Sequence, residues 1–206
     1  AAEREGELRP EARRSAAVND ALAEAKALLE AAHQPPRPAQ DGAVPLLDPE
    51  ARLAAFDPPE ALLQTMEQDV RGTHHAAVVR EELERIQAAR AQFLAASRRL
   101  LPAGNVRALA AHQKLVQEHR ESKHANDHLL ALADLYARLA EEYVVAHPPE
   151  SLSFDPPRFE ELVEAAARLY EAVANQDGAP EKVVAGRRLE AFLAFTLQVD
   201  RDRFSP

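Results

Sequence analysis

The chain has 206 residues, of which 25 are Lys or Arg and 34 are Asp or Glu, so its formal net charge is −9. This acidic balance favours solubility and argues against a general nucleic-acid binder, which would be basic overall. There is no cysteine, which excludes disulfides, thiolate catalysis and cysteine-ligated metal sites. No apolar run approaches the roughly 18 residues of a membrane span, so no transmembrane segment is predicted.

The composition predicts an all-α protein. Six glycines against fifteen prolines suit long helices with sharp ends better than a sheet with many Gly-rich turns. The chain begins with Ala1 rather than Met, and two explanations are open. It is either an exported (periplasmic) or organelle-imported chain whose leader was removed, or a trimmed segment, with a slight preference for the first.

The N-terminal part is expected to hold one helix and one linker. Residues 1–10 are polar and charged and are expected to fray. Apolar residues at helical spacing predict a helix from Glu11 to about His33. The Pro-rich segment 34–47 cannot continue it and is predicted to be a linker. Asp48 and Pro49 then fit the N-cap and first position of a short helix.

The sequence Phe-Asp-Pro-Pro occurs twice, at residues 56–59 and 154–157. In each copy Asp suits an N-cap, Pro suits the first helical turn, and Phe suits a hydrophobic staple, predicted between Phe154 and Phe159. Glu60 is predicted to complete a capping box. We therefore interpret both copies as helix starts, with duplication of a unit of about 100 residues as the alternative.

Two helices are predicted over residues 58–101 and 106–147, and the turn at 102–105 joins them into one long antiparallel hairpin. The buried stripe expected on the first consists of Leu62, Met66, Val70, Thr73, Ala77, Leu83, Ile86, Phe93 and Leu100. A kink or break at Gly72 is compatible with this pattern.

Two further amphipathic helices follow the hairpin. The apolar residues expected to be buried on them are Phe159, Leu162, Val163, Ala166, Leu169, Tyr170 and Val173, then Val184, Leu189, Phe192, Leu193, Phe195 and Val199. The prediction is one domain over residues 1–206, an all-α helical bundle of four to six helices built on the long hairpin.

The middle of the second hairpin helix is unusually polar. Its heptad-like seam contains His112, His119, Ser122 and Asn126 where a coiled coil prefers Leu or Ile. Such groups must be hydrogen-bonded, solvated or bound to a ligand, because burying each one unpaired costs about 1–3 kcal/mol.

A divalent metal site is one explanation of this polar segment. His124 and His128 are four residues apart and share a helix face. Pairing residue i with residue 207−i across an unbroken hairpin places Glu81 and Glu82 opposite Asn126 and Ala125, within reach of the two histidines. Such a set suits a borderline metal. The alternative is a solvated stretch in which these carboxylates pair with nearby cations, and no other cofactor is predicted.

The closed end of the hairpin is basic. Between Ile86 and Gln117 there is no Asp or Glu, and the five cations expected to bind a partner are Arg90, Arg98, Arg99, Arg107 and Lys114. Arg98 and Arg99 also suit the last turn of a helix, where cations favour the helix dipole. The excess of positive charge that the helix dipole does not explain predicts docking on a protein with an acidic surface. Nucleic acid is disfavoured as a partner because no aromatic side chains are interleaved with the cations to stack on bases.

No catalytic motif is present, neither a Gly-rich phosphate loop nor an HExxH or G-x-S-x-G sequence. The sequence therefore favours a non-catalytic helical-bundle protein that binds other proteins, as an accessory or scaffold subunit docking through the basic hairpin tip. The alternative function is a metal- or cofactor-binding bundle using the His/Glu cluster. The oligomeric state is left open.

Overall fold

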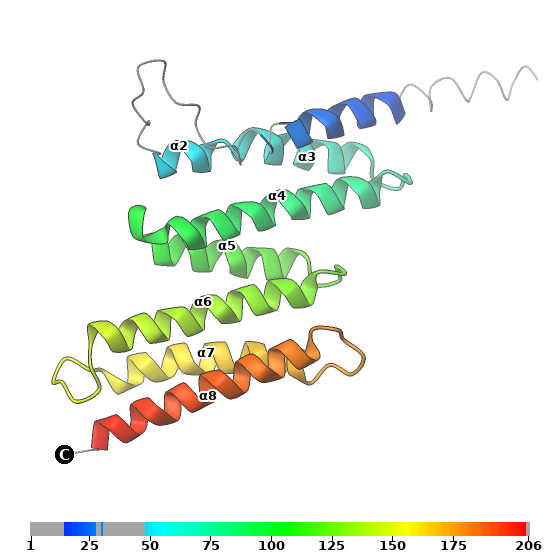
Figure 1. Ribbon diagram of the computed structural model, residues 1–206. Helices are drawn as coiled ribbons and strands as arrows, with labels where there is room; N and C mark the ends of the chain where they lie inside the picture. Colours follow the sequence, from blue (N-terminus) through cyan, green and yellow to red (C-terminus); the bar gives the residue numbers. More distant parts are fainter. Residues whose placement is uncertain (1–14, 28–29, 31–47, 205–206) are drawn as a thin grey trace, which may run out of the picture. The chain divides into compact units, whose positions relative to one another are not determined.

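The computed structural model describes residues 15–27, 30 and 48–204, and every regular element among them is a helix (Figure 1). This confirms the all-α class. No helix within the described ranges combines the length and the apolar character needed to cross a membrane. The predicted frayed segment 1–10 and the Pro-rich linker 34–47 lie outside the described residues.

The chain divides into two compact units between Ala111 and His112, inside one helix. Unit 1 contains the helix over residues 15–27, α2 (Pro49–Ala54), α3 (Asp57–Asp69), α4 (Ala76–Ser97), the short 3-10 helix η1 (Arg98–Leu100) and the first half of α5 (Gly104–Glu118). Unit 2 contains the second half of α5, α6 (Ala125–Ala146), α7 (Pro156–Ala174) and α8 (Lys182–Phe204).

The prediction of two helices of about 40 residues was wrong, because each is two helices separated by a turn. The first breaks between α3 and α4, and the second between α5 and α6. Gly72 explains the first break, since its φ of 79° lies in the left-handed region that glycine adopts most easily. In the second, the hydroxyl of Ser122 accepts a hydrogen bond from the backbone N–H of His124 (3.0 Å), a local turn that competes with helix.

Three turns share one backbone hydrogen-bond pattern. They begin at Val70, His119 and Gln176, which are 49 and 57 residues apart, and join α3 to α4, α5 to α6 and α7 to α8. In the first turn the N–H groups of Thr73, Ala76 and Val79 donate to the carbonyls of Val70, Thr73 and His75, respectively. The corresponding residues of the other two turns make the same three hydrogen bonds, and all of them measure 2.9–3.4 Å. The turn pattern therefore recurs at intervals of about 50 residues, and the duplication of a unit of about 100 residues stays a prediction.

The first and third of these turns also have glycine at the same position. Gly72 and Gly178 are each two residues after the start of their turn and have φ values of 79° and 81°. In the first and second turns a hydroxyl accepts from the N–H two residues later, Thr73 from His75 (3.3 Å) and Ser122 from His124 (3.0 Å). The first turn thus has both the glycine and the hydroxyl, the second has only the hydroxyl, and the third has only the glycine.

Unit 1 is held together by apolar contacts and one buried carboxylate. Leu63, Val79 and Ile86 are almost completely buried. The carboxylate of Glu60 is buried too and accepts hydrogen bonds from the side chains of Gln64 (3.2 Å), Gln87 (3.3 Å) and Arg90 (2.8 Å). Glu60 therefore links α3 to α4 instead of forming the predicted capping box. On the predicted stripe, Met66, Val70, Leu83 and Ile86 are buried, whereas Thr73, Ala77 and Leu100 are exposed.

The Phe-Asp-Pro-Pro segments start helices, though not by the predicted aspartate caps. Asp57 is already the first residue of α3, and the side chain of Asp155, the N-cap of α7, makes no capping hydrogen bond. The proline placement is confirmed in both helices, as is the contact between the rings of Phe154 and Phe159 (5.6 Å). Asp48 does cap α2, accepting from the N–H of Glu50 at 3.0 Å.

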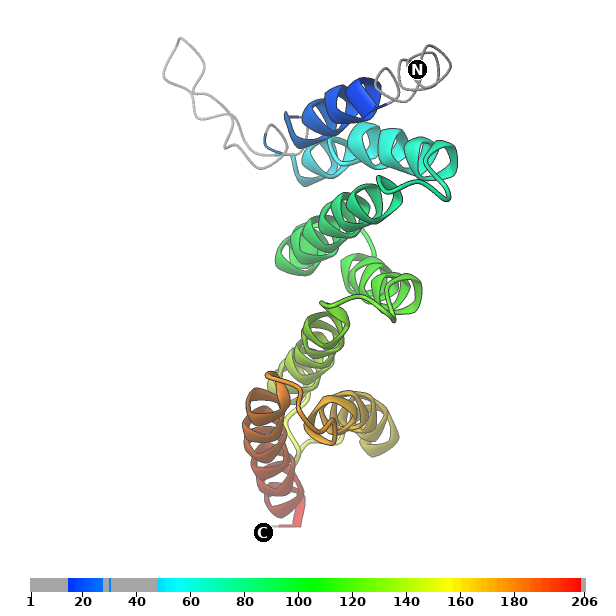
Figure 2. The ribbon, with the colours of Figure 1, turned by 90° about the vertical axis from the view of Figure 1, so that its right-hand side faces the viewer.

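In unit 2, α7 packs between α6 and α8 along much of its length, and Figures 1 and 2 both show the three helices as neighbours. The hydroxyl of Tyr170 donates to Asp134 on α6 (2.7 Å), and the other oxygen of that carboxylate accepts from Arg188 on α8 (2.7 Å). One carboxylate thus joins three helices. On α8, Phe192 and Val199 are buried as predicted, but Val184 and Leu193 are exposed.

Candidate functional site

The turn between α4 and α5, which we call the tip (residues 98–107), has a constrained backbone. Helix α4 ends at Ser97 and continues as η1, after which Leu101 is extended and buried. Ala103 has a φ of 49°, a left-handed conformation that costs a non-glycine residue about 1–2 kcal/mol. A Cβ on Gly104 would overlap the backbone carbonyl of Arg98, so close backbone packing requires glycine there.

Two large aliphatic side chains are exposed on the tip. Leu100 is 75% exposed and Val106 is 68% exposed, and Arg99 between them in sequence is exposed as well. The prediction that Leu100 belongs to the buried stripe was wrong, because the α-helix ends before it. The tip therefore presents apolar surface together with a positive charge.

Two of the five predicted partner-binding cations interact with carboxylates that are distant in sequence. Arg90 contacts both Asp57 and Glu60 at 2.8 Å. Arg107 forms a two-pronged ion pair with Glu50, one arm of which measures 3.0 Å. Hydrogen bonding to Arg107 lowers the pKa of Glu50, and the same bond raises the pKa of Arg107. The tertiary fold therefore offsets part of the positive charge that is concentrated along the sequence.

The other three cations differ in exposure. Arg98 is buried and donates to the carbonyl of Ala95 at 2.9 Å, which places it in the local structure of the tip. Arg99 is exposed at the surface. Lys114 belongs to unit 2, where its ammonium group lies 3.9 Å from Glu118, one turn further along α5. Of the three arginines of the tip, Arg98 is buried, Arg107 is partly buried and Arg99 is exposed.

The histidines of the polar segment lie in unit 2 around the turn between α5 and α6. His112, His119 and His128 are buried, whereas His124 is exposed and lies 3.4 Å from Asp127. The ring of His128 is 6.3 Å from that of His119 and 6.5 Å from that of His124. Asn126 donates to Glu181 at 3.2 Å, linking α6 to the turn before α8.

The carboxylates of the predicted metal set belong to unit 1. Glu82 is buried and forms ion pairs with Lys26 and Arg85, both at 3.2 Å, while Glu81 is exposed. Placing them opposite His124 and His128 assumed two unbroken helices, and both helices are broken. Within the described part of the chain, no group of three or more His, Asp or Glu side chains is arranged to hold a metal ion. The four-residue metal set stays a prediction.

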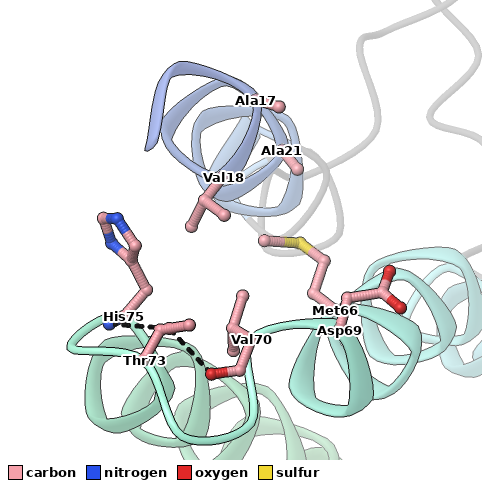
Figure 3. A pocket seen from close by; sticks show the side chains of 8 residues that line it. All are labelled: Ala17, Val18, Ala21, Met66, Asp69, Val70, Thr73 and His75. Carbon is pink, nitrogen blue, oxygen red and sulfur yellow. Dashed lines mark hydrogen bonds between the residues drawn. The ribbon is translucent and has the colours of Figure 1, made fainter. Parts of the chain in front are cut away.

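Unit 1 also contains a cavity of about 360 Å³ between the helix over residues 15–27 and the end of α3 with its following turn (Figure 3). Its lining side chains are Ala17, Val18, Ala21, Met66, Asp69, Val70, Thr73 and His75. Thr73 donates to the carbonyl of Val70 (2.7 Å), and the ring of His75 contacts the hydroxyl of Ser15 (3.0 Å). Most of the wall is therefore apolar, with Thr73 and His75 on one side and the exposed Asp69 on the other, beyond Met66 (Figure 3).

Sequence reasoning identified neither the exposed pair on the tip nor the cavity. Leu100 fits helical periodicity, and the only signal against burial is its position two residues before Pro102. Ala17 and Ala21 border the cavity with short side chains, opposite Met66 and Val70. Small residues beside an expected helix interface are the available signal for such a gap.

Comparison with known proteins finds no family model, no characterised protein and no solved structure that matches this chain.

Proposed function

We propose that the chain is a non-catalytic helical protein that binds another protein, as an accessory or scaffold subunit, and that the tip is its docking surface. The single observation that carries the proposal is the exposure of Leu100 and Val106, 75% and 68%, on a turn whose backbone is fixed by close packing. Exposed aliphatic side chains on a constrained turn bind at low entropic cost, because little has to be ordered on association.

The chemistry of the tip indicates the kind of partner. Leu100 and Val106 suit an apolar depression, and the guanidinium of Arg99 suits a carboxylate beside it. Arg90 and Arg107 are paired within unit 1, so their proposed role is to support the tip rather than to contact the partner. A partner surface that is apolar at its centre and acidic at its rim fits this arrangement.

The test uses the full chain as bait, followed by binding measurements with the purified partner. The variants are Leu100→Asp with Val106→Asp, and separately Arg99→Glu. Val145→Asp on α6 is the matched control, because Val145 is 83% exposed and lies in unit 2. We expect the tip variants to weaken binding at least about tenfold, the range of an anchoring residue, with unchanged helicity. Equal Kd values for the tip variants and the control would contradict the proposal.

Metal binding by His124 and His128 is a second candidate, favoured by the ring contacts that His128 makes with His119 and His124. An ion that binds only the folded state raises the melting midpoint. The candidate therefore expects zinc, copper, nickel or iron to raise the midpoint of the wild type and not that of His124→Ala with His128→Ala. A midpoint that none of the four metals changes would exclude it.

A further inference from the structure

The cavity of unit 1 combines an apolar wall with a single carboxylate. Val18, Met66 and Val70 supply aliphatic surface, and Asp69 is the one acidic side chain among the lining residues (Figure 3). The volume of about 360 Å³ lies at the small end of the range of ligand pockets in proteins, about 300–1,000 Å³. A ligand of this site is therefore a small aliphatic molecule rather than a large cofactor.

Asp69 stands at a place where a negative charge is unfavourable. It is the last residue of α3, and the last turn of this helix contains no basic residue. The C-terminus of a helix carries a partial negative charge from its unsatisfied carbonyls, so a carboxylate there is repelled rather than stabilised. Within the described residues the carboxylate of Asp69 has no hydrogen bond and no ion pair.

The other polar groups of the wall are already engaged. The hydroxyl of Thr73 donates to Val70 and accepts from the N–H of His75, and the ring of His75 meets Ser15. The negative potential at the edge of the cavity therefore comes from Asp69 and the helix terminus together, and it is available to a cation.

We propose that this cavity binds a small aliphatic amine, with the alkyl chain against Val18, Met66 and Val70 and the ammonium group beside Asp69. An ammonium group at this position relieves the repulsion between Asp69 and the helix terminus and gains both attractions. Each methylene group that leaves water for the cavity raises the affinity about fourfold. The proposal is independent of docking through the tip.

The experiment titrates the full chain with hexylamine, 1-hexanol and hexanoate at neutral pH and follows the methyl NMR signals of Val18, Met66 and Val70. We expect hexylamine to shift these signals with a Kd on the order of a millimolar. It should bind about two- to fivefold more tightly than hexanol, the range of a partly exposed ion pair. Hexanoate should bind most weakly.

Two variants and a control separate charge from shape. Asp69→Asn should make hexylamine and hexanol bind equally, and Ala21→Leu should fill the cavity and weaken both. Glu190→Gln removes an exposed carboxylate from α8 in unit 2 and should change neither Kd. The proposal is overturned if hexylamine and hexanol bind the wild type equally, if neither shifts these methyl signals, or if Ala21→Leu binds as the wild type does.

Discussion

Two carboxylates in this protein connect neighbouring helices through hydrogen bonds. Asp134 accepts hydrogen bonds from Tyr170 and Arg188, and Glu60 accepts them from Gln64, Gln87 and Arg90. Glu60 is buried, where a carboxylate without partners would be costly, and Asp134 is partly buried. Three donors satisfy the carboxylate of Glu60 and two satisfy that of Asp134, so each group connects neighbouring helices.

Tyr170 is the residue whose contribution to stability should depend on pH. It is 3% exposed, and burial together with its hydrogen bond to Asp134 raises its pKa well above the ordinary value. The folded state therefore favours the protonated phenol. The resulting stabilisation is fully present below about pH 10, the pKa in an unfolded chain, and decreases as the pH rises above it.

We expect Tyr170→Phe to lower the free energy of unfolding at pH 7 by about 1–2 kcal/mol, because the hydrogen bond to Asp134 is lost. Above pH 10 the difference between wild type and variant should shrink, since only the wild type must keep this phenol protonated in order to fold. Urea unfolding at several pH values between 7 and 11 measures it. A difference that is constant or grows over this range would contradict the assignment.

Residue roles could be read from the sequence only where they depend on near neighbours. The cap of Asp48 and the ring contact of Phe154 with Phe159 were predictable because each spans at most five residues. The role of Glu60 was not, because its partners Gln87 and Arg90 are 27 and 30 residues away. For the same reason the basic segment looked unpaired until Glu50 and Asp57 were placed beside it.

At the scale of elements, the turns decide the architecture. The apolar pattern is interrupted at both breaks, because residues 119–124 contain no apolar side chain and residues 70–75 contain only Val70. We interpreted the second interruption as a polar stretch of one helix rather than as a turn. Gly72 was the visible signal of the first turn. The starts of α7 and α2 were predictable because a proline stands in the first turn of each helix.

The shared turn pattern predicts how to stabilise the third turn. Ala179 stands where Thr73 and Ser122 stand in the first two turns, and it has no hydroxyl to accept from the N–H of Glu181. We expect Ala179→Ser to raise the free energy of unfolding by about 0.5–1 kcal/mol, the net value of one hydrogen bond. Thermal and urea melts of the variant and the wild type measure this gain.

The converse variants serve as controls for this prediction. Ser122→Ala should lower the free energy of unfolding by a similar amount, and Thr73→Ala by more, because Thr73 also donates to the carbonyl of Val70. If Ala179→Ser is destabilising while Ser122→Ala costs nothing, the turns are not equivalent and the repeat has no energetic meaning.

Two substitutions in the tip should have opposite effects on the free energy of unfolding. Gly104→Ala places a Cβ against the carbonyl of Arg98 and should cost about 1–3 kcal/mol or more, as overpacking does. Ala103→Gly relieves the left-handed conformation of Ala103 and should be neutral or stabilise by up to about 1 kcal/mol. Urea unfolding of both variants distinguishes these signs, and equal effects would contradict the fixed geometry of the tip.

For the whole molecule, the sequence predicted the fold class but not the arrangement. Composition and the scarcity of glycine sufficed for an all-α chain, because they act everywhere along it. The prediction of two unbroken hairpin helices was wrong because a turn of six residues interrupts each of them. We still propose that a protein partner binds at the tip. The proposal now rests on Leu100, Val106 and Arg99 rather than on all five cations.

Hydrogen exchange of the full chain with and without its purified protein partner tests docking through the tip most directly. Bound protein shields the backbone amides it covers, so exchange at residues 99–107 should slow when the partner is present. The exposed loop 147–153 in unit 2 provides an internal reference and should exchange at an unchanged rate. Slower exchange at 147–153 with no change at 99–107 would contradict the account.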